Sequence, residues 1–172
     1  TLDAQLLPDS ASFEIVQSNL VIKNKELSYA LFKEFPNDVT LDKKGFAEMT
    51  RKFANSVHNL DFNFKNYTIT SLAGIENFPN LTELHCSGTH LKECDLSKNT
   101  LLQYVSLLAN ELTSLDFSKN VNLRSVHCGL NNNLTTLNIK ECTQLTSVRC
   151  GETALTSLEF HDITKIQALD FG

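Results

Sequence analysis

The stretch LQYVSLLANEL at residues 102–112 decides the fold. Its pattern of apolar and polar residues begins five times, at positions 81, 102, 123, 145 and 166, so successive copies start 21, 21, 22 and 21 residues apart. The third copy is one residue longer, and its run of asparagines at 131–133 is a loop-like place for the extra residue. A repeat of this length predicts a protein built from stacked coils.

Each copy carries apolar residues at its first, fourth and sixth positions, followed by polar residues and a second apolar set. One copy has too little apolar surface to close a core, whereas stacking places each apolar position on its counterpart in the next copy. The alternation at positions four to six predicts a short strand with one buried face, and adjacent copies are expected to pair as parallel strands about 4.8 Å apart. Two core columns follow from this register: Leu84, Val105, Val126, Val148 and Leu169 in the first, and Cys86, Leu107, Cys128, Cys150 and Phe171 in the second.

The ninth position of the copies carries Thr89, Asn110, Asn131 and Thr153, where the chain must turn away from the strand. An asparagine amide can bond to the backbone of its own turn and of the next coil, and a threonine hydroxyl can make part of these bonds. The same residues would also suit ordinary surface turns. Their recurrence in register favours a ladder of hydrogen-bonded side chains.

This pattern is the leucine-rich repeat signature, Leu-x-x-Leu-x-Leu-x-x-Asn-x-Leu. The second copy matches it in full, with Leu102, Val105, Leu107, Asn110 and Leu112. The tails LSKN at 96–99 and FSKN at 117–120, together with cysteine at position six, resemble bacterial surface repeats of the internalin-like type with a cysteine ladder. The resemblance implies an α/β solenoid, a right-handed coil with short parallel strands on one face, and a location outside the cell or on its surface.

The repeats divide the chain into two parts. A diverged copy begins at position 57, 24 residues before the copy at 81, so residues 57–172 form the predicted repeat domain. Stacked repeats need a cap over their first core face and sheet edge, and we expect residues 1–56 to supply a helical one. The predicted elements of this cap are extended segments at 13–16 and 19–22 and helices over 23–37 and 42–57.

Length and charge restrict the function. The chain has 172 residues and a formal net charge of −5, which gives no reason to expect a nucleic-acid partner. No apolar run reaches the length of a transmembrane helix, so we expect no membrane insertion by this segment. The chain does not begin with Met, so the lack of an export signal says nothing about its compartment.

The connection between the two predicted helices is partly similar to a calcium-binding loop. Asp38, Thr40 and Asp42 stand at the spacing of the first three ligands. Lys43 replaces the required glycine, however, and Met49 replaces the bidentate glutamate. We therefore predict a structural connection, and neither a metal nor a cofactor.

Five cysteines leave at least one without an intramolecular disulfide partner. Cys128 and Cys150 are expected in adjacent strands, at a spacing somewhat too wide for a relaxed disulfide. Cys86 lies two coils from Cys128, which does not supply the tetrahedral ligands of a zinc site. The favoured interpretation is a ladder of free, buried thiols, with a disulfide or a metal as the alternatives. Cys142 is expected nearer the surface.

No catalytic constellation is visible in the sequence. His127 precedes Cys128, but neighbours in a strand point to opposite faces and cannot act together as a base and a nucleophile. There is no Gly-rich phosphate loop, Ser-centred elbow or His–Glu metal motif. We do not expect an enzyme.

Binding is expected on the strand face that points away from the core. Its side chains vary from copy to copy, and a rigid sheet of varied side chains suits recognition. Tyrosine and arginine are favoured at interface hot spots, although single exposed apolar residues are also common without any function. The predicted binding residues are Tyr104, Leu108, His127, Leu130, Arg149 and His85.

These features favour a non-catalytic module that recognises a protein or a glycan at the bacterial cell surface. One alternative is a structural unit that assembles into homo-oligomers through the open edge at its C-terminal coil, Phe171 included. Another is an accessory domain of a larger enzyme.

Overall fold

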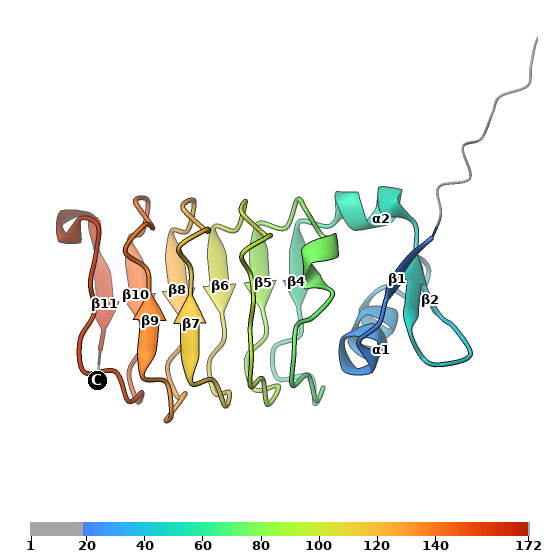
Figure 1. The fold of residues 1–172 in the computed structure, drawn as a ribbon, viewed down its shortest axis with the longest axis horizontal. Helices are drawn as coiled ribbons and strands as arrows, with labels where there is room; N and C mark the ends of the chain where they lie inside the picture. The colour runs from blue at the N-terminus through green and yellow to red at the C-terminus, as the bar shows by residue number, and fades with distance from the viewer. Residues whose placement is uncertain (1–18, 172) are drawn as a thin grey trace, which may run out of the picture.

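The computed structural model describes residues 19–171, which form an elongated solenoid with a cap at its N-terminal end (Figure 1). The strands of the solenoid stand side by side in one parallel sheet of order β11-β10-β8-β6-β5-β4. Each strand comes from a different coil. They are β4 (Asn59–Asp61), β5 (Glu83–His85), β6 (Tyr104–Ser106), β8 (Ser125–His127), β10 (Ser147–Arg149) and β11 (Ala168–Asp170).

The sheet confirms the predicted register. Val105 pairs with Leu84 on one side and with Val126 on the other, and Val148 continues the same column. These side chains are fully buried, as are Cys86, Leu107, Cys128 and Cys150 in the second column. The last coil differs, since Leu169 is 49% exposed and Phe171 is 37% exposed. The last coil therefore leaves the ends of both columns partly open.

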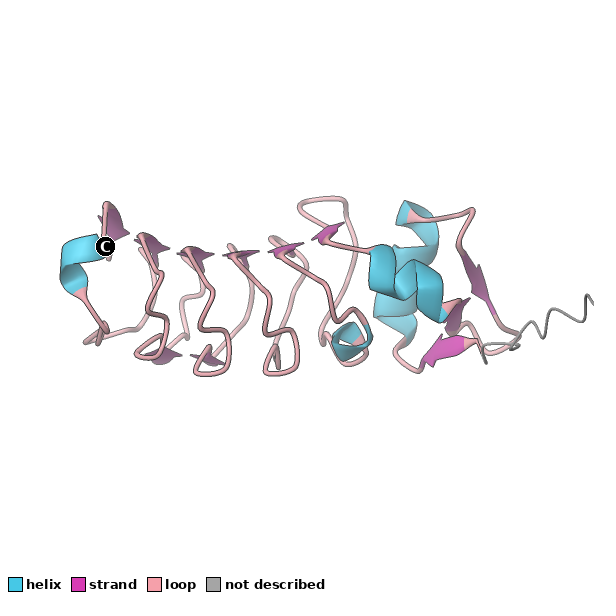
Figure 2. Ribbon diagram, turned by 90° about the horizontal axis from the view of Figure 1, so that it is seen from above, coloured by secondary structure: helices cyan, strands magenta, loops and turns pink. Residues whose placement is uncertain are grey.

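A second, smaller sheet lies on the opposite side of the coil, where no strand was predicted (Figure 2). It pairs β7 (Ser114–Asp116) with β9 (Thr136–Asn138) in parallel. Leu115 and Leu137 face each other in this sheet and are buried. The predicted solenoid with short parallel strands on one face is thus confirmed by the six-stranded sheet, and this two-stranded sheet is an addition to it. The other connections are loops and two short 3-10 helices, η1 (Ile75–Asn77) and η2 (Ile163–Lys165).

The cap contains two α-helices and a three-stranded antiparallel sheet of order β1-β3-β2. Helix α1 confirms the first predicted helix in a shorter form, because the Asn24 side chain accepts the Leu27 N–H and begins it at Lys25. The extended segment at 19–22 is confirmed as β1, whereas the one predicted at 13–16 lies outside the described residues. The elements are β1 (Leu20–Ile22), α1 (Lys25–Glu34), β2 (Val39–Leu41), β3 (Ala47–Met49) and α2 (Arg51–Ser56).

The helix predicted over 42–57 was wrong in its first half. The Asp42 carboxylate accepts the backbone N–H groups of Lys44 and Phe46, and Gly45 adopts a left-handed φ of 81°. This tight turn closes the hairpin of β2 and β3, and only α2 is helical. The Asp42 oxygen that was considered for calcium is thus engaged by its own backbone.

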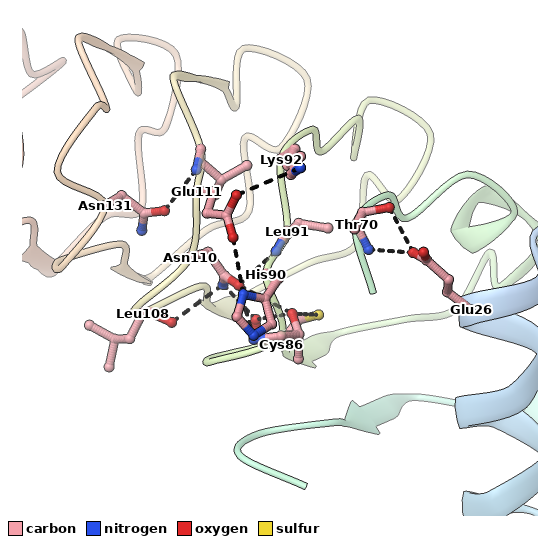
Figure 3. A network of polar contacts seen from close by, with 12 residues as sticks. Glu26, Thr70, Cys86, His90, Leu91, Lys92, Leu108, Asn110, Glu111 and Asn131 are labelled. Atoms are coloured by element: carbon pink, nitrogen blue, oxygen red, sulfur yellow. Dashed lines mark hydrogen bonds and ion pairs between the residues drawn. The ribbon is translucent and has the colours of Figure 1, made fainter. Parts of the chain in front are cut away.

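Two glutamates of α1 join the helix to the first coil. The Glu26 carboxylate accepts both the N–H and the hydroxyl of Thr70 (Figure 3). The Glu34 carboxylate accepts the Tyr67 hydroxyl at 2.7 Å and pairs with the Lys65 ammonium at 2.8 Å. Burial and the adjacent Glu34 raise the pKa of Tyr67 to about 12, so its hydroxyl remains a donor at neutral pH.

Each coil turns sharply just after its strand. The eighth residue has a left-handed φ in the five copies that begin at 57, 81, 102, 123 and 145, at Phe64, Gly88, Ala109, Leu130 and Glu152. The predicted asparagine ladder follows it. Asn110 is buried and donates to the carbonyl oxygens of Cys86 and Leu107, while its own oxygen accepts the Leu91 N–H (Figure 3). Asn131 repeats the pattern one coil later, which confirms the ladder.

A second ladder, which was not predicted from the sequence, lies at the end of each coil. Buried Asn99 donates to the carbonyl oxygens of Ile75 and Phe78, and buried Asn120 does the same one coil later. Cys142 takes the next rung, with its sulfur 3.5 Å from the Phe117 oxygen. Cys142 is only 3% exposed, so the expectation that it lies near the surface was wrong. It replaces a buried asparagine.

Candidate functional site

The predicted binding face is the outward side of the six-stranded sheet. The register places one outward column at Asp61, His85, Ser106, His127, Arg149 and Asp170, and a neighbouring column at Asn59, Glu83, Tyr104, Ser125, Ser147 and Ala168. Side chains in each column are about 4.8 Å apart from coil to coil. The six predicted residues fall into two groups on this face.

The first group is an aromatic cluster of His85, Tyr104 and His127. The Tyr104 ring lies 4.9 Å from the His85 ring at a tilt of 31°, and 5.2 Å from the His127 ring in an edge arrangement. The Tyr104 hydroxyl is 3.0 Å from His127 Nδ1, and the Ser125 hydroxyl is 3.2 Å from His127 Nε2. Both polar atoms of the His127 ring therefore already have partners within the chain.

The electrostatics of this cluster follow from its packing. Partial burial lowers the pKa of His127, and the positive charge of Arg149 and the neighbouring His85 lower it further. His127 is therefore neutral at pH 7. The cluster forms a rigid, half-buried platform in the middle of the face.

The second group surrounds a hollow of about 340 Å³ next to this platform. Three predicted residues line it: Leu108, Leu130 and Arg149. Leu130 is 47% exposed, although its left-handed φ of 57° is unfavourable for a leucine. The turn thus holds an apolar side chain at the surface, beside Leu108 in the lining of the hollow.

The hollow exists because two coils carry glycine just after the strand. A Cβ atom at Gly129 would lie 2.8 Å from the Gly151 carbonyl oxygen, and one at Gly151 would lie 2.9 Å from an Asp170 carboxylate oxygen. These contacts are shorter than real Cβ atoms show. The two glycines therefore form a floor without side chains, in which Gly129 is buried and Gly151 is half-buried.

Four lining residues were not predicted from the sequence: Gly129, Gly151, Glu152 and Asp170. The usable signal was the dipeptide Cys-Gly, which occurs at 128–129 and again at 150–151. The second copy has Leu108 at the corresponding position. Glycine in the third and fourth copies therefore marks the place where the face has no side chains. Asp170 is the next residue of the outward column after Arg149, as the pairing of β10 with β11 shows.

The cysteines lie on the other side of the strands. Cys128 is fully buried, whereas the neighbouring His127 points to the outer face and bonds to Tyr104. Burial raises the pKa of Cys128 to about 12 and that of Cys86 to about 11, so these thiols remain protonated at neutral pH. All five cysteines are free thiols, in agreement with the interpretation favoured from the sequence.

Two further properties of residues 19–171 follow from the arrangement of their side chains and helices. No group of three or more His, Cys, Asp or Glu side chains in this part is arranged to hold a metal ion. No helix there has the length and apolarity needed to cross a membrane.

A larger hollow of about 1010 Å³ lies on the β7 side of the coil. Its lining mixes lysines with acidic residues, and it includes Asp95 and Asp116. Both carboxylates accept backbone N–H groups two residues further on, at Ser97 and Ser118. They have a local structural role, and this hollow is a weaker candidate for recognition.

No protein-family model matches the chain, and no curated protein matches it. Among solved structures, it is similar to the functional domain of InlJ from Listeria monocytogenes, which includes a cysteine ladder. The identity is 22% over 73% of this chain and 37% of that one, with a TM-score of 0.40. It is also similar to internalin C2 from Listeria monocytogenes, with 15% identity over 85% and 82% of the two chains and a TM-score of 0.35.

The chain thus spans little more than a third of the InlJ structure that it matches. The internalin-like resemblance stated from the sequence recurs among these structures. The assignment of the fold rests on the chain's own coordinates, through the in-register coils, the buried asparagines and the cysteines of the core column. By these features the protein is a leucine-rich repeat solenoid.

Proposed function

We propose that the chain is a non-catalytic binding module that recognises a protein or a glycan through the outward face of its six-stranded sheet. The observation that carries the proposal is the hollow beside the aromatic cluster. Two leucines and an exposed arginine, Leu108, Leu130 and Arg149, come together there over a floor of glycine. Recessed apolar surface beside a charged, planar donor is typical of the anchor positions of interfaces.

The aromatic cluster has a supporting role in this proposal. The two imidazoles lie against Tyr104, and the Tyr104 hydroxyl is bonded to His127. The Tyr104 ring is thus held in place before any partner arrives, which lowers the entropic cost of binding. The resemblance of the repeats to bacterial surface proteins favours recognition outside the cell or on its surface.

The test is a capture experiment with the immobilised protein, screened against extracellular proteins and against a glycan array. Tyr104→Ala and Arg149→Ala should each reduce capture of the retained ligand at least about tenfold, as expected for hot-spot residues. Lys119→Ala, on the far side of the coil, serves as the matched control. Capture that survives both changes on the face would show that the wrong surface was chosen.

A second candidate function is assembly through the last coil, favoured by the exposure of Leu169 and Phe171. Exposed apolar side chains of a coil can stack on a second copy. Light scattering over a range of concentrations tests this candidate. Dimers that disappear on Phe171→Asp would support it, and a monomer at all concentrations would exclude it.

A further inference from the structure

We propose that the 340 Å³ hollow accepts a lysine or arginine side chain from a protein partner, with the aliphatic part along Leu108 and Leu130 and the cation at Glu152 and Asp170. This inference rests on the proposed function and decides between its two ligand classes in favour of a protein.

The hollow has a direction along the solenoid. Leu108 belongs to the second regular coil, Leu130 to the third, Glu152 to the fourth, and Asp170 to the fifth. Successive coils are about 4.8 Å apart, so the lining spans roughly 14 Å from its first coil to its last. The Leu108 side chain leans over Gly129 and the Asp170 carboxylate over Gly151, so the apolar and acidic groups lie over adjacent coils. The extended side chain of lysine, about 6 Å from Cα to Nζ, spans one such spacing of about 4.8 Å.

The polarity of the lining changes along the same direction. The end nearer the middle of the molecule is apolar, since it contains the two leucines above the Gly129 floor. The other end carries the carboxylates of Glu152 and Asp170, and the Asp170 oxygens lie over Gly151. A side chain with an apolar stem and a charged tip matches both ends at once.

The charges of the lining favour a cation over an anion. Two carboxylates stand against the single guanidinium of Arg149, which leaves one negative charge in excess. Arg149 and Asp170 are partners across β10 and β11, so Asp170 offsets the repulsion that Arg149 would exert on a bound cation. The ion pairs within 4.0 Å in the described part of the chain involve none of these three residues.

Arg149 keeps a separate task in this arrangement. Its side chain stands on the wall of the hollow, beside the aromatic cluster. Its N–H groups can donate to main-chain carbonyl oxygens of the partner next to the inserted side chain. Loss of Arg149 should therefore weaken the binding of partners without a cationic side chain as well, whereas loss of the carboxylates should weaken the binding of cationic partners only.

The test uses three peptides that differ at one position, acetyl-Ala-Gly-Xaa-Gly-Ala-amide with Xaa as lysine, norleucine or glutamate. Norleucine keeps the aliphatic stem of lysine without its charge. Each peptide is titrated into ¹⁵N-labelled protein and followed by amide chemical shifts. We expect the lysine peptide to shift the signals of Gly129, Leu130 and Gly151 at saturable concentrations, and norleucine to bind about fivefold more weakly.

Variants locate the effect. The double change Glu152→Gln with Asp170→Asn keeps the size and shape of both side chains. It should lower the affinity of the lysine peptide to that of the norleucine peptide. Glu83→Gln removes a carboxylate from the same face outside the hollow and should leave the preference intact. Added salt should weaken the lysine peptide more than the norleucine peptide, because its extra affinity is electrostatic.

Equal affinity of lysine and norleucine, tighter binding of glutamate, or shifts that map outside the hollow would each overturn this inference. So would a preference for lysine that survives the double change. The proposed function would still stand if a captured ligand depended on Tyr104 and Arg149. The proposed function would be contradicted by a different result, namely that Tyr104→Ala and Arg149→Ala both leave capture of the ligand unchanged.

Discussion

The two buried ladders of the solenoid differ in how completely their side chains are bonded. Next to the binding face, Asn110 uses both ends of its amide, with its oxygen accepting the N–H groups of Thr89 and Leu91. On the other ladder, Asn99 and Asn120 donate two hydrogen bonds each, but their side-chain oxygens have no partner within the described residues. The asparagine side chains next to the binding face therefore make more hydrogen bonds to the backbone than those of the other ladder.

The difference explains which residues each ladder accepts. Where only donors are used, a thiol can replace the amide, and Cys142 does so with two longer contacts to carbonyl oxygens. Where donor and acceptor are both used, the replacements are Thr89 and Thr153, whose hydroxyls donate to the carbonyls of Cys86 and Cys150. The fully bonded ladder follows the glycine floor of the hollow directly, so the geometry of the site depends on it.

The largest expected effect is that of Asn131→Ala. The change leaves the buried carbonyl oxygens of Leu107 and Cys128 and the Leu112 N–H without this partner. Each lost bond to a buried group costs about 1–3 kcal/mol, so we expect a loss of about 3–5 kcal/mol in the free energy of unfolding. Urea unfolding measures it, and a loss below about 1 kcal/mol would show that the ladder is not essential.

Asn120→Ala should cost less, about 1–3 kcal/mol, because two donated bonds are lost and no accepted one. The same urea experiment compares the two variants directly. The expected order is contradicted if Asn120→Ala is as destabilising as Asn131→Ala.

Cysteine substitutions sharpen the comparison. Asn120→Cys should recover part of what Asn120→Ala loses, on the order of 1 kcal/mol, because Cys142 shows that a thiol suits this ladder. Asn131→Cys should be no better than Asn131→Ala, since a thiol accepts hydrogen bonds poorly. Equal rescue at both sites would mean that side-chain volume, rather than bonding, determines the difference.

The Cys142 thiol also gives this ladder a dependence on pH. Burial, aided by Asp116 and Glu141, raises the pKa of Cys142 from 9.0 to about 11. The unfolded chain therefore loses this proton first, and stability falls as the pH rises from 9 towards 11. Between pH 8 and pH 10, the free energy of unfolding of Cys142→Ala should fall by up to about 1 kcal/mol less than that of the parent protein. Parallel declines in urea unfolding would contradict this.

The smallest effect concerns the turn just before the fully bonded ladder. Leu130→Gly removes the cost of a left-handed φ from an exposed residue, so stability should stay equal or rise by up to about 1 kcal/mol. Ala109→Gly is the matched control, because it relieves the same strain outside the hollow. Only Leu130→Gly should weaken capture of the ligand. A large loss of stability would show that Leu130 is a structural residue.

The core columns could be predicted from the sequence because stacked coils repeat one environment, so a residue such as Val126 finds its neighbours 21 or 22 positions away. The cap was harder, since its contacts are unique. Phe46, Met49 and Phe53 have a helical spacing, but the turn at Asp42 and Gly45 prevailed over it. The hollow escaped prediction because it is defined by missing side chains, at Gly129 and Gly151, and a periodic pattern of present ones does not reveal it.

The extra residue of the third copy lies beside the exposed Asn132 and Asn133, and the strands before and after it still pair in register, Ser125 with Ser147 and His127 with Arg149. Chain length is therefore absorbed at this loop without displacing the sheet. An affinity tag or a fluorescent label inserted between Asn132 and Asn133 should report on the protein while leaving its recognition surface intact. A protein labelled in this way would be traceable in whatever setting its partner is sought.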